Sequence, residues 1–187
     1  MDDKKSEVVG PYTLVAMLYN GGYHGVIWKG GSKVVKVTGN DVDDCLAKVR
    51  DRLGDLLQAD ALARKDSSPS VTETVTALHR IAPRLSQGQL LMLRAHYNAP
   101  NRCITATQLS QAADYEGYQS ANLQYGRVGW LMYGELPTPL PRRPSDGKLV
   151  YTCALAEEAD QRADDEAQWL WKMRPHIAEA LVAAKLV

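Results

Sequence analysis

The segment 105–133 constrains the fold more than any other part of this chain, because its sequence predicts two helices joined by a tight turn. It reads TATQLSQAADYEGYQSANLQYGRVGWLMY. Thr105 with Gln108 three residues later matches a capping box, which marks the start of the first helix. The tetrapeptide DYEG forms the turn, where Gly117 is free to adopt a positive φ. We therefore expect a helix-turn-helix whose second helix begins near Tyr118.

A helical projection gives the second of these helices an inner face and an outer face. The inner face, which we expect in the core, consists of Ala121, Tyr125, Val128 and Met132. The outer face carries Gln119, Leu123, Gly126 and Trp130. Leu123 and Trp130 are apolar residues on an outward face, and they therefore predict a binding partner. That partner can be another segment of this chain, a second copy in a homodimer or a bound ligand.

Polar side chains on the outer face and flanks of this helix are of the types that contact DNA. They are Gln119, Ser120, Asn122 and Arg127. Asn and Gln can form paired hydrogen bonds with adenine, and Arg can do so with guanine. Because a recognition helix reads bases with its N-terminal part, we expect Gln119, Ser120 and Asn122 to contact base edges. The alternative is a helical bundle without DNA binding, in which these side chains are solvated.

The residues after this helix predict a β-hairpin, which would form the wing of a winged helix-turn-helix. We expect residues 149–155 as its first strand and Trp169–Met173 as its second, joined by the acidic segment 157–166. Winged modules often place basic residues on DNA phosphates. The candidates here are Arg142, Arg143 and Lys148. Pro175 suits the first position of a final helix.

The first 65 residues predict a small β-β-β-α module. Three short strands are expected at 12–19, 23–28 and 34–38, separated by Gly-rich turns. In the helix that follows, apolar residues from Val42 to Leu57 recur at helical spacing and would cover one face of the sheet. The module can serve as a structural or docking domain. Alternatively, its sheet can lie on DNA, with charge supplied by Lys29, Lys33 and Lys36.

A polar segment that contains a proline, residues 66–70, predicts a linker between this module and a helical domain that spans 71–187. A helix is expected from Val71 to Ile81, and Ser86 with Gln89 forms a second capping box. The predicted fold class is therefore α+β, with the small N-terminal module followed by a winged helix-turn-helix-like helical domain.

The formal net charge is zero, but the charge is distributed unevenly along the chain. Residues 1–75 carry 10 basic and 11 acidic side chains, residues 76–151 carry 8 and 4, and residues 152–187 carry 4 and 7. The basic middle part contains the predicted helix-turn-helix, which suits a surface that faces phosphates. The excess of 4 basic side chains in residues 76–151 (8 against 4) is modest, and with a pI near 6.9 it argues against strong non-specific binding of nucleic acid.

The sequence contains no pattern typical of a catalytic, metal or cofactor site. Cys45, Cys103 and Cys153 lack metal-ligand spacing, and we expect them as free thiols in a cytoplasmic protein. His79 and His96 lack ligand spacing as well, and we interpret them as surface or helix-flank residues. No nucleophile is spaced beside a base, which favours a binding protein over an enzyme. No segment approaches the ~20 apolar residues of a membrane span, and the N-terminal residues lack the apolar core of a signal peptide.

The run TATQLSQAADYEGYQSANLQYGRVG, with WLWKMRPHIAEALVAAKLV at the end of the chain, resembles a family of poorly characterised bacterial proteins. The family pattern is TATxLAxAxGYxxYxxxNLxYGxLG followed by WxMRPxxxxAL, and the resemblance covers residues 85–187. It implies a DNA-related role in restriction or mobile-element systems, sometimes beside HNH nuclease domains. This chain has no HNH motif, so a nuclease activity would belong to a partner. It departs from the pattern at Asp114, where the pattern has Gly.

Two functions are consistent with these observations. The first is a non-enzymatic protein that binds double-stranded DNA, as a regulator or as the target-recognition part of a defence system. The second is a protein-binding inhibitor of a bacterial defence complex, similar to the anti-CRISPR proteins that phages and mobile elements encode. The helix-turn-helix pattern and the basic middle part favour the first function. The neutral net charge, the acidic segment 157–166 and the outward Leu123 and Trp130 favour the second.

Overall fold

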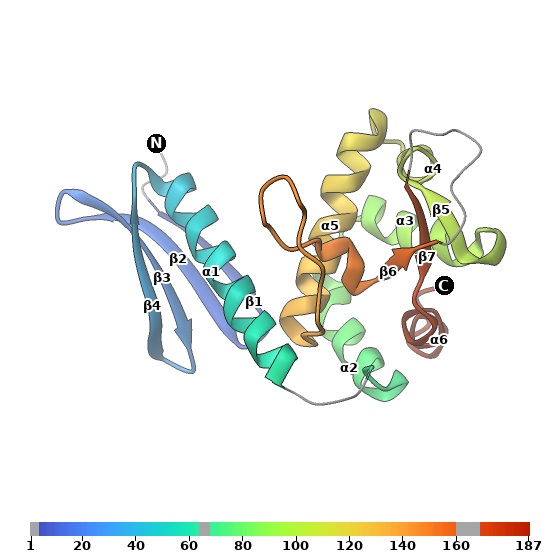
Figure 1. Cartoon of the computed structure of the whole chain (residues 1–187), viewed down its shortest axis with the longest axis horizontal. Helices are drawn as coiled ribbons and strands as arrows, with labels where there is room; N and C mark the ends of the chain where they lie inside the picture. Colours follow the sequence, from blue (N-terminus) through green and yellow to red (C-terminus); the bar gives the residue numbers. More distant parts are fainter. Residues whose placement is uncertain (1–3, 64–67, 160–168) are drawn as a thin grey trace.

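The computed structural model describes residues 4–63, 68–159 and 169–187, which form a mixed α+β structure (Figure 1). At one end of the molecule, a four-stranded antiparallel sheet is covered by one long helix. At the other end, several helices surround a second, three-stranded sheet. We call residues 4–63 the N-terminal module and the described residues after them the C-terminal domain. The α+β class that the sequence predicts is confirmed.

The N-terminal sheet contains four strands, and the prediction of three was wrong. They are β1 (Lys4–Val9), β2 (Tyr12–Tyr19), β3 (Gly22–Lys29) and β4 (Ser32–Gly39), which pair in the order β1-β2-β3-β4. The missed strand is β1, whose residues are mostly charged or polar. Two of its charged side chains form ion pairs with α1 (Val42–Ala63), the helix that follows the sheet. Lys5 Nζ lies 2.6 Å from Asp43 Oδ1, and Glu7 Oε2 lies 2.6 Å from Arg50 Nε. Charged side chains are common on edge strands, where they discourage pairing with other chains.

Helix α1 (Val42–Ala63) covers one face of this sheet, as its apolar repeat predicts. Asp41 caps the helix, because its side chain accepts a hydrogen bond of 2.7 Å from the backbone N–H of Asp44. The helix approaches the sheet closely at Gly25 of β3, where a Cβ would stand 2.7 Å from Val49 Cγ1. A glycine in the middle of a strand commonly marks such a close approach.

The C-terminal domain is mostly helical. Its helices are α2 (Val71–Ile81), α3 (Gln87–Asn98), α4 (Ala106–Ala112), α5 (Gly117–Glu135) and α6 (Pro175–Ala183). Short 3₁₀ helices are η1 (Ala82–Arg84), η2 (Pro100–Arg102) and η3 (Tyr151–Ala154). The strands of its sheet are β5 (Cys103–Thr105), β6 (Ala156–Glu158) and β7 (Leu170–Met173). They are antiparallel in the order β5-β7-β6, so the last strand of the chain lies in the middle.

Local sequence signals predict where these helices begin. Ser86 and Gln89 form the expected capping box at the start of α3, in which each side chain accepts a hydrogen bond from the backbone of the other residue. Thr105 and Gln108 do the same at the start of α4. Pro175 is the first residue of α6. All three predictions are confirmed, because caps depend on residues that are close together in the sequence.

The segment 149–155 is not the strand that the sequence predicts, because η3 occupies most of it. The reason is tertiary packing. The ring of Tyr151 contacts two aromatic rings of α5, with centroids 4.8 Å from Trp130 and 5.7 Å from Tyr133. The first strand of the small hairpin is instead β6, and β7 is the predicted second strand. The acidic segment between them lies outside the described residues from position 160 onward.

The N-terminal module and the C-terminal domain share one continuous hydrophobic core. The turn between β1 and β2 lies directly on the C-terminal half of α5. A Cβ on Gly10 would stand 2.1 Å from the backbone oxygen of Gly134, and a Cβ on Gly134 would stand 2.3 Å from Val9 Cγ1. Side chains are therefore excluded at both positions, and the two backbones are in direct contact.

A buried amide also joins the two parts. Gln58 of α1 accepts hydrogen bonds of 3.1 Å from the Tyr133 hydroxyl and from the backbone N–H of Leu140, and it donates one of 2.9 Å to the Leu140 oxygen. A buried polar group that loses its partners costs about 1–3 kcal/mol. The full set of partners of Gln58 therefore favours one relative orientation of the N-terminal module and the C-terminal domain.

We predict that Gly10→Ala destabilises the protein more than Gly30→Ala. Both glycines have a φ of +53°, so both substitutions carry the cost of a left-handed alanine, about 1–2 kcal/mol. The added methyl group at Gly30 meets open space, whereas the one at Gly10 meets the backbone of Gly134. Displacing that turn costs roughly a further 1–3 kcal/mol. Urea unfolding measures the difference, and equal midpoints for the two variants would contradict the close packing on α5.

Candidate nucleic-acid interface on helix α5

The inner face of α5 is the one that the helical projection predicts. Ala121, Tyr125, Val128 and Met132 are at most 2 % exposed. They pack into the core that the helices of the C-terminal domain share. The prediction of these four core residues is confirmed. Because they occupy one side of α5, the other sides of the helix are available for other contacts.

Two residues at the junction of α4 and α5 lie in the left-handed region. Gly117 has a φ of +78°, as the sequence predicts, and Asp114 has a φ of +55°. Asp adopts this region more readily than most residues with a side chain. This explains how Asp114 can stand where the bacterial family pattern has Gly. The turn is held against α3, since a Cβ on Gly88 would stand 2.2 Å from the Tyr115 hydroxyl oxygen.

The chain itself covers the outer face of the C-terminal half of α5. Trp130, for which the sequence predicts a binding partner, is 7 % exposed, and its Nε1–H donates a hydrogen bond of 2.8 Å to Glu7 Oε1. Its ring packs edge-on against Tyr151. Gly129 permits this, because a Cβ there would stand 2.1 Å from the backbone oxygen of Tyr151. The partner of Trp130 is therefore another segment of this chain, which removes Trp130 as an external binding residue.

The N-terminal half of α5 keeps an exposed surface. We call this surface the α5 outer face, and it consists of Tyr118, Gln119, Asn122, Leu123 and Arg127. The two apolar side chains are well exposed, Tyr118 at 48 % and Leu123 at 57 %. Arg127 has no carboxylate of the described residues within ion-pair distance. The surface thus combines amide, aromatic, aliphatic and cationic groups.

Two of the three predicted base readers lie on this face. Gln119 and Asn122 are exposed on neighbouring turns of the helix. Ser120 is half-buried, and its hydroxyl donates a hydrogen bond of 3.2 Å to the backbone oxygen of Glu116. A serine that bonds to the preceding turn has its donor occupied. Ser120 is therefore the weakest of the three candidates for base contact.

His96 of α3 anchors the inner side of α5, and its prediction as a surface residue was wrong. The side chain is fully buried, and its Nδ1 accepts a hydrogen bond of 2.6 Å from the Tyr125 hydroxyl. Its Nε2–H donates to the backbone oxygens of Arg102 at 3.1 Å and Trp171 at 3.0 Å. Carbonyl oxygens only accept, so the proton lies on Nε2. Burial lowers the pKa of His96 to about 4, and the neutral ring joins α3, α5, η2 and β7.

The basic residues predicted to contact phosphates are paired with carboxylates of this chain. The pairs are Arg142–Asp55 at 2.9 Å, Lys148–Asp51 at 3.3 Å and Arg143–Asp146 at 3.4 Å. Asp51 and Asp55 belong to α1, and Figure 1 shows the loop that carries the basic residues in orange between α1 and α5. These cations therefore do not extend the α5 outer face into a continuous unpaired basic surface.

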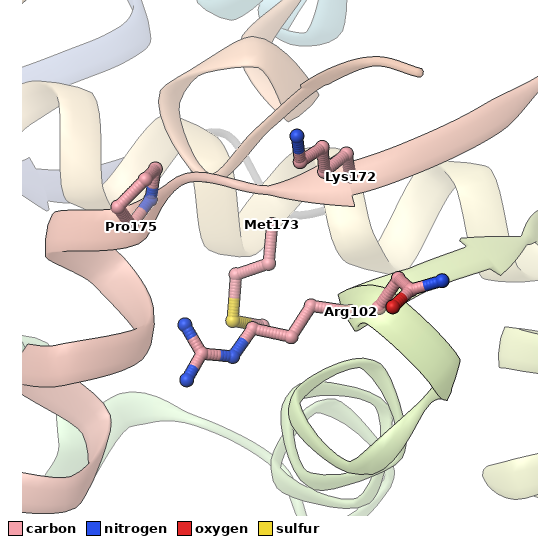
Figure 2. A pocket seen from close by; sticks show the side chains of 5 residues that line it. Arg102, Lys172, Met173 and Pro175 are labelled. Carbon is pink, nitrogen blue, oxygen red and sulfur yellow. The ribbon is translucent and has the colours of Figure 1, made fainter. Parts of the chain in front are cut away.

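A shallow hollow lies where η2 meets β7 and the start of α6 (Figure 2). It is lined by Asn101, Arg102, Lys172, Met173 and Pro175. In Figure 2, Lys172 and Met173 point to opposite sides of β7, and Met173 points toward the Arg102 side chain. The guanidinium of Arg102 lies 5.2 Å from the centre of the Tyr97 ring. Lys172 is the one side chain of this lining that can act as a nucleophile, and no carboxylate, histidine or thiol of the lining stands beside it as a base, so this hollow offers no catalytic pair.

The described residues show no cluster of candidate metal ligands, and two of the three cysteines are buried. No group of three or more His, Cys, Asp or Glu side chains there is arranged to hold a metal ion. Cys45 and Cys153 are buried, and burial raises the pKa of both thiols, which disfavours the reactive thiolate. Within the same residues, no helix has the length and apolar character needed to cross a bilayer.

Comparisons with known proteins identify no relative of this chain: no protein-family model, no curated protein sequence and no solved structure matches it. The resemblance to the bacterial family therefore rests on the quoted motif, and it stays a prediction.

We predict that His96 makes the stability of the protein dependent on pH between about 6.5 and 4. The folded state holds the ring neutral down to a pKa of about 4, whereas an unfolded chain protonates it near 6.5. The unfolded state then binds the extra proton, so the free energy of unfolding falls as pH decreases through this window, by about 3 kcal/mol in total. Above pH 6.5, His96 contributes no pH dependence.

The measurement is urea unfolding at several pH values for the wild type, His96→Gln and the exposed His79→Gln. Carboxylates contribute the same pH dependence of stability to all three proteins. We expect a shallower pH dependence for His96→Gln and an unchanged one for His79→Gln. If the wild type and His96→Gln lose stability equally between pH 6.5 and 4, the buried neutral ring is contradicted.

Proposed function

We propose that this chain binds double-stranded DNA through the α5 outer face, as a winged helix-turn-helix. The observation that carries the proposal is the order α3, β5, α4, α5, β6 and β7, with β7 between β5 and β6 in the sheet. A winged helix-turn-helix has three helices and three strands in the same order, with the last strand in the middle of the small sheet. By this correspondence, α4 and α5 form the helix-turn-helix and β6–β7 the wing.

Insertion into the major groove would bring the first turns of α5 against base edges. Gln119 and Asn122 are exposed on neighbouring turns, where each amide can form paired hydrogen bonds with adenine. Arg127 lies farther along the helix, where it can reach a guanine or a phosphate. Recognition helices contact bases with their N-terminal residues, and that is the half of α5 that the described residues leave exposed.

The charge of this surface predicts a modest dependence of binding on salt. Arg127 is the unpaired cation of the α5 outer face, while Asp114 and Glu116 are exposed at its start. The paired cations of the loop 142–148 can reach phosphates only after they leave their carboxylates. Exposed ion pairs contribute about 0–1 kcal/mol, so this exchange costs little. We therefore expect affinity to depend on base contacts more than on released counterions.

We predict that Asn122→Ala weakens binding to a duplex selected from a random library about tenfold or more, because a paired amide–adenine contact contributes about 1–3 kcal/mol. Fluorescence anisotropy with the selected duplex measures this.

Arg127→Ala should weaken binding to selected and random duplexes alike if Arg127 contacts a phosphate. Arg52→Ala, which removes an exposed arginine from α1, is the matched control and should have no effect. Failure to enrich any duplex at low salt would refute the proposal.

One observation favours a second candidate, a protein that binds and inhibits a bacterial defence complex. Leu123 and Tyr118 are 57 % and 48 % exposed on the α5 outer face. The fully buried centre of a protein interface is more apolar than the rest of the surface and is depleted in charged residues. The internal pairing of Arg142, Arg143 and Lys148 fits this candidate as well.

Leu123→Asp and Asn122→Ala separate the two candidates. If α5 binds a protein, Leu123→Asp should abolish capture of that partner from a nuclease-treated bacterial lysate, because a buried unpaired carboxylate is costly. Asn122→Ala should have a smaller effect on that capture. If the wild type captures nucleic acid alone from an untreated lysate, and no protein from the treated one, the inhibitor candidate fails.

A further inference from the structure

The face of the N-terminal sheet that α1 does not cover differs in composition from the rest of the module. Strand alternation and register place three rows of side chains on it. The rows are Lys4–Met17–His24–Thr38, Ser6–Val15–Val26–Lys36 and Val8–Thr13–Trp28–Lys33. We call these residues the open sheet face.

The side chains between these rows point the other way, toward α1. Leu14, Ala16 and Ile27 are fully buried beneath the helix. Lys5 and Glu7 of β1 form ion pairs with α1. Because successive residues of a strand alternate between its two faces, the open sheet face lies opposite α1. Most of its rim is exposed to solvent.

The open sheet face carries lysines and no carboxylate. Lys4, Lys33 and Lys36 are exposed, and none of them forms an ion pair within the described residues. The acidic residues of the N-terminal module all lie on the strand face toward α1, or in and just before α1. They are Glu7, Asp41, Asp43, Asp44, Asp51, Asp55 and Asp60. The module therefore has a basic side and an acidic side, although its overall charge is nearly balanced.

The lysines flank an apolar centre. Lys4 lies on the outer strand β1, and Lys33 and Lys36 lie on the other outer strand, β4. The inner strands β2 and β3 contribute mostly apolar and aromatic side chains to this face. The two outer strands are separated by three spacings of ~4.8 Å each. Cations thus lie on both sides of a strip that is about 14 Å wide.

A β-bulge pairs the exposed tryptophan with one of these lysines. Ile27 lies opposite Val35, and regular pairing would then place Trp28 opposite Val34. The register shifts between Ile27 and Trp28, so that Trp28 lies opposite Lys33 instead. Bulges are a known means of redirecting a side chain in a sheet. Here the result is a 36 % exposed aromatic ring beside a cation.

We propose that the open sheet face binds single-stranded nucleic acid. A single strand offers the two chemical groups that this face complements, which are flat base surfaces and a chain of phosphates. Bases can stack on Trp28 and lie over the apolar centre, while the lysines of β1 and β4 contact phosphates. This surface is separate from the α5 outer face, and its proposed ligand differs from the duplex assigned to α5.

Two other occupants fit the face less well. A duplex hides its base surfaces in the stack and presents polar groove edges, which do not match an apolar centre formed by residues such as Val15 and Met17. A second copy of the sheet, packed face to face, would bring the exposed lysines of both copies together without a carboxylate to separate them. Like charges opposite one another destabilise such pairing.

The test uses the full chain and a labelled single-stranded oligonucleotide of mixed sequence, about 15 nucleotides long, which lies near the upper end of the site sizes of small single-strand-binding folds. We expect the triple variant Lys4→Gln, Lys33→Gln, Lys36→Gln to bind about tenfold or more weakly at low salt. The slope of log affinity against log salt should fall by about 2, since each phosphate contact on a single strand contributes about 0.7. Trp28→Ala should weaken binding about fivefold or more through lost stacking.

The matched control is Lys5→Gln, Lys29→Gln, Lys48→Gln, which removes the same charge from the other side of the module. Lys5 and Lys48 pair with acids of α1, and Lys29 lies 5.0 Å from the centre of the Tyr12 ring. This control should bind the oligonucleotide like the wild type, and so should Asn122→Ala of α5. Circular dichroism checks that each variant folds.

Three results would overturn the proposal. The first is equal single-strand affinity for the wild type, the open-face triple variant and the control. The second is tighter binding of a duplex that depends on the same three lysines. The third is that polyglutamate binds as tightly as the oligonucleotide and that Trp28→Ala weakens neither ligand. That result would assign the open sheet face to an acidic protein. Loss of duplex binding in Asn122→Ala alone bears on α5 and leaves this proposal unchanged.

Discussion

The contact between the Val9–Gly10 turn and Gly134 of α5 is the interaction on which the rest of the structure depends. It brings two backbones together where a single Cβ would stand 2.1 Å from a carbonyl oxygen. The N-terminal sheet is thereby seated on the C-terminal half of the longest helix of the C-terminal domain. Gln58, Tyr133 and Trp130 then find their hydrogen-bond partners across the same boundary. The predicted module and the predicted domain therefore form a single core.

This packing divides α5 into two parts with different roles. Its second half is interior, since η3 and the N-terminal module cover it. Its first half is fixed from behind by the hydrogen bond between His96 and Tyr125, and its outer side is open. A helix held in this way presents a rigid surface, which lowers the entropy cost of binding a duplex or a protein. Within the described residues, the same arrangement leaves the far side of the N-terminal sheet exposed, so the molecule has two exposed surfaces with different chemistry.

Features that depend on nearby residues could be predicted from the sequence. The capping boxes at Ser86 and Thr105 and the inner face of α5 are examples, because a cap or a helical stripe is encoded within a few residues. Features that depend on distant partners could not be predicted. Asp51 and Asp55 neutralise cations more than 85 positions away, and Tyr151 turns a β-prone segment into a 3₁₀ helix. The outward position of Gln119 and Leu123 could be predicted, whereas the burial of Trp130 required the fold.

The most direct measurement is a titration of the isotope-labelled protein with the selected duplex, followed by NMR chemical shifts of the backbone amides. If the open half of α5 is the recognition surface, the shifts should concentrate at residues 117–127 and in the β6–β7 hairpin. Residues 128–135, which are covered by η3 and by the turn at Gly10, should change little. Shifts spread over α1, or absent from residues 117–127 while the duplex is bound, would contradict a recognition helix at this position.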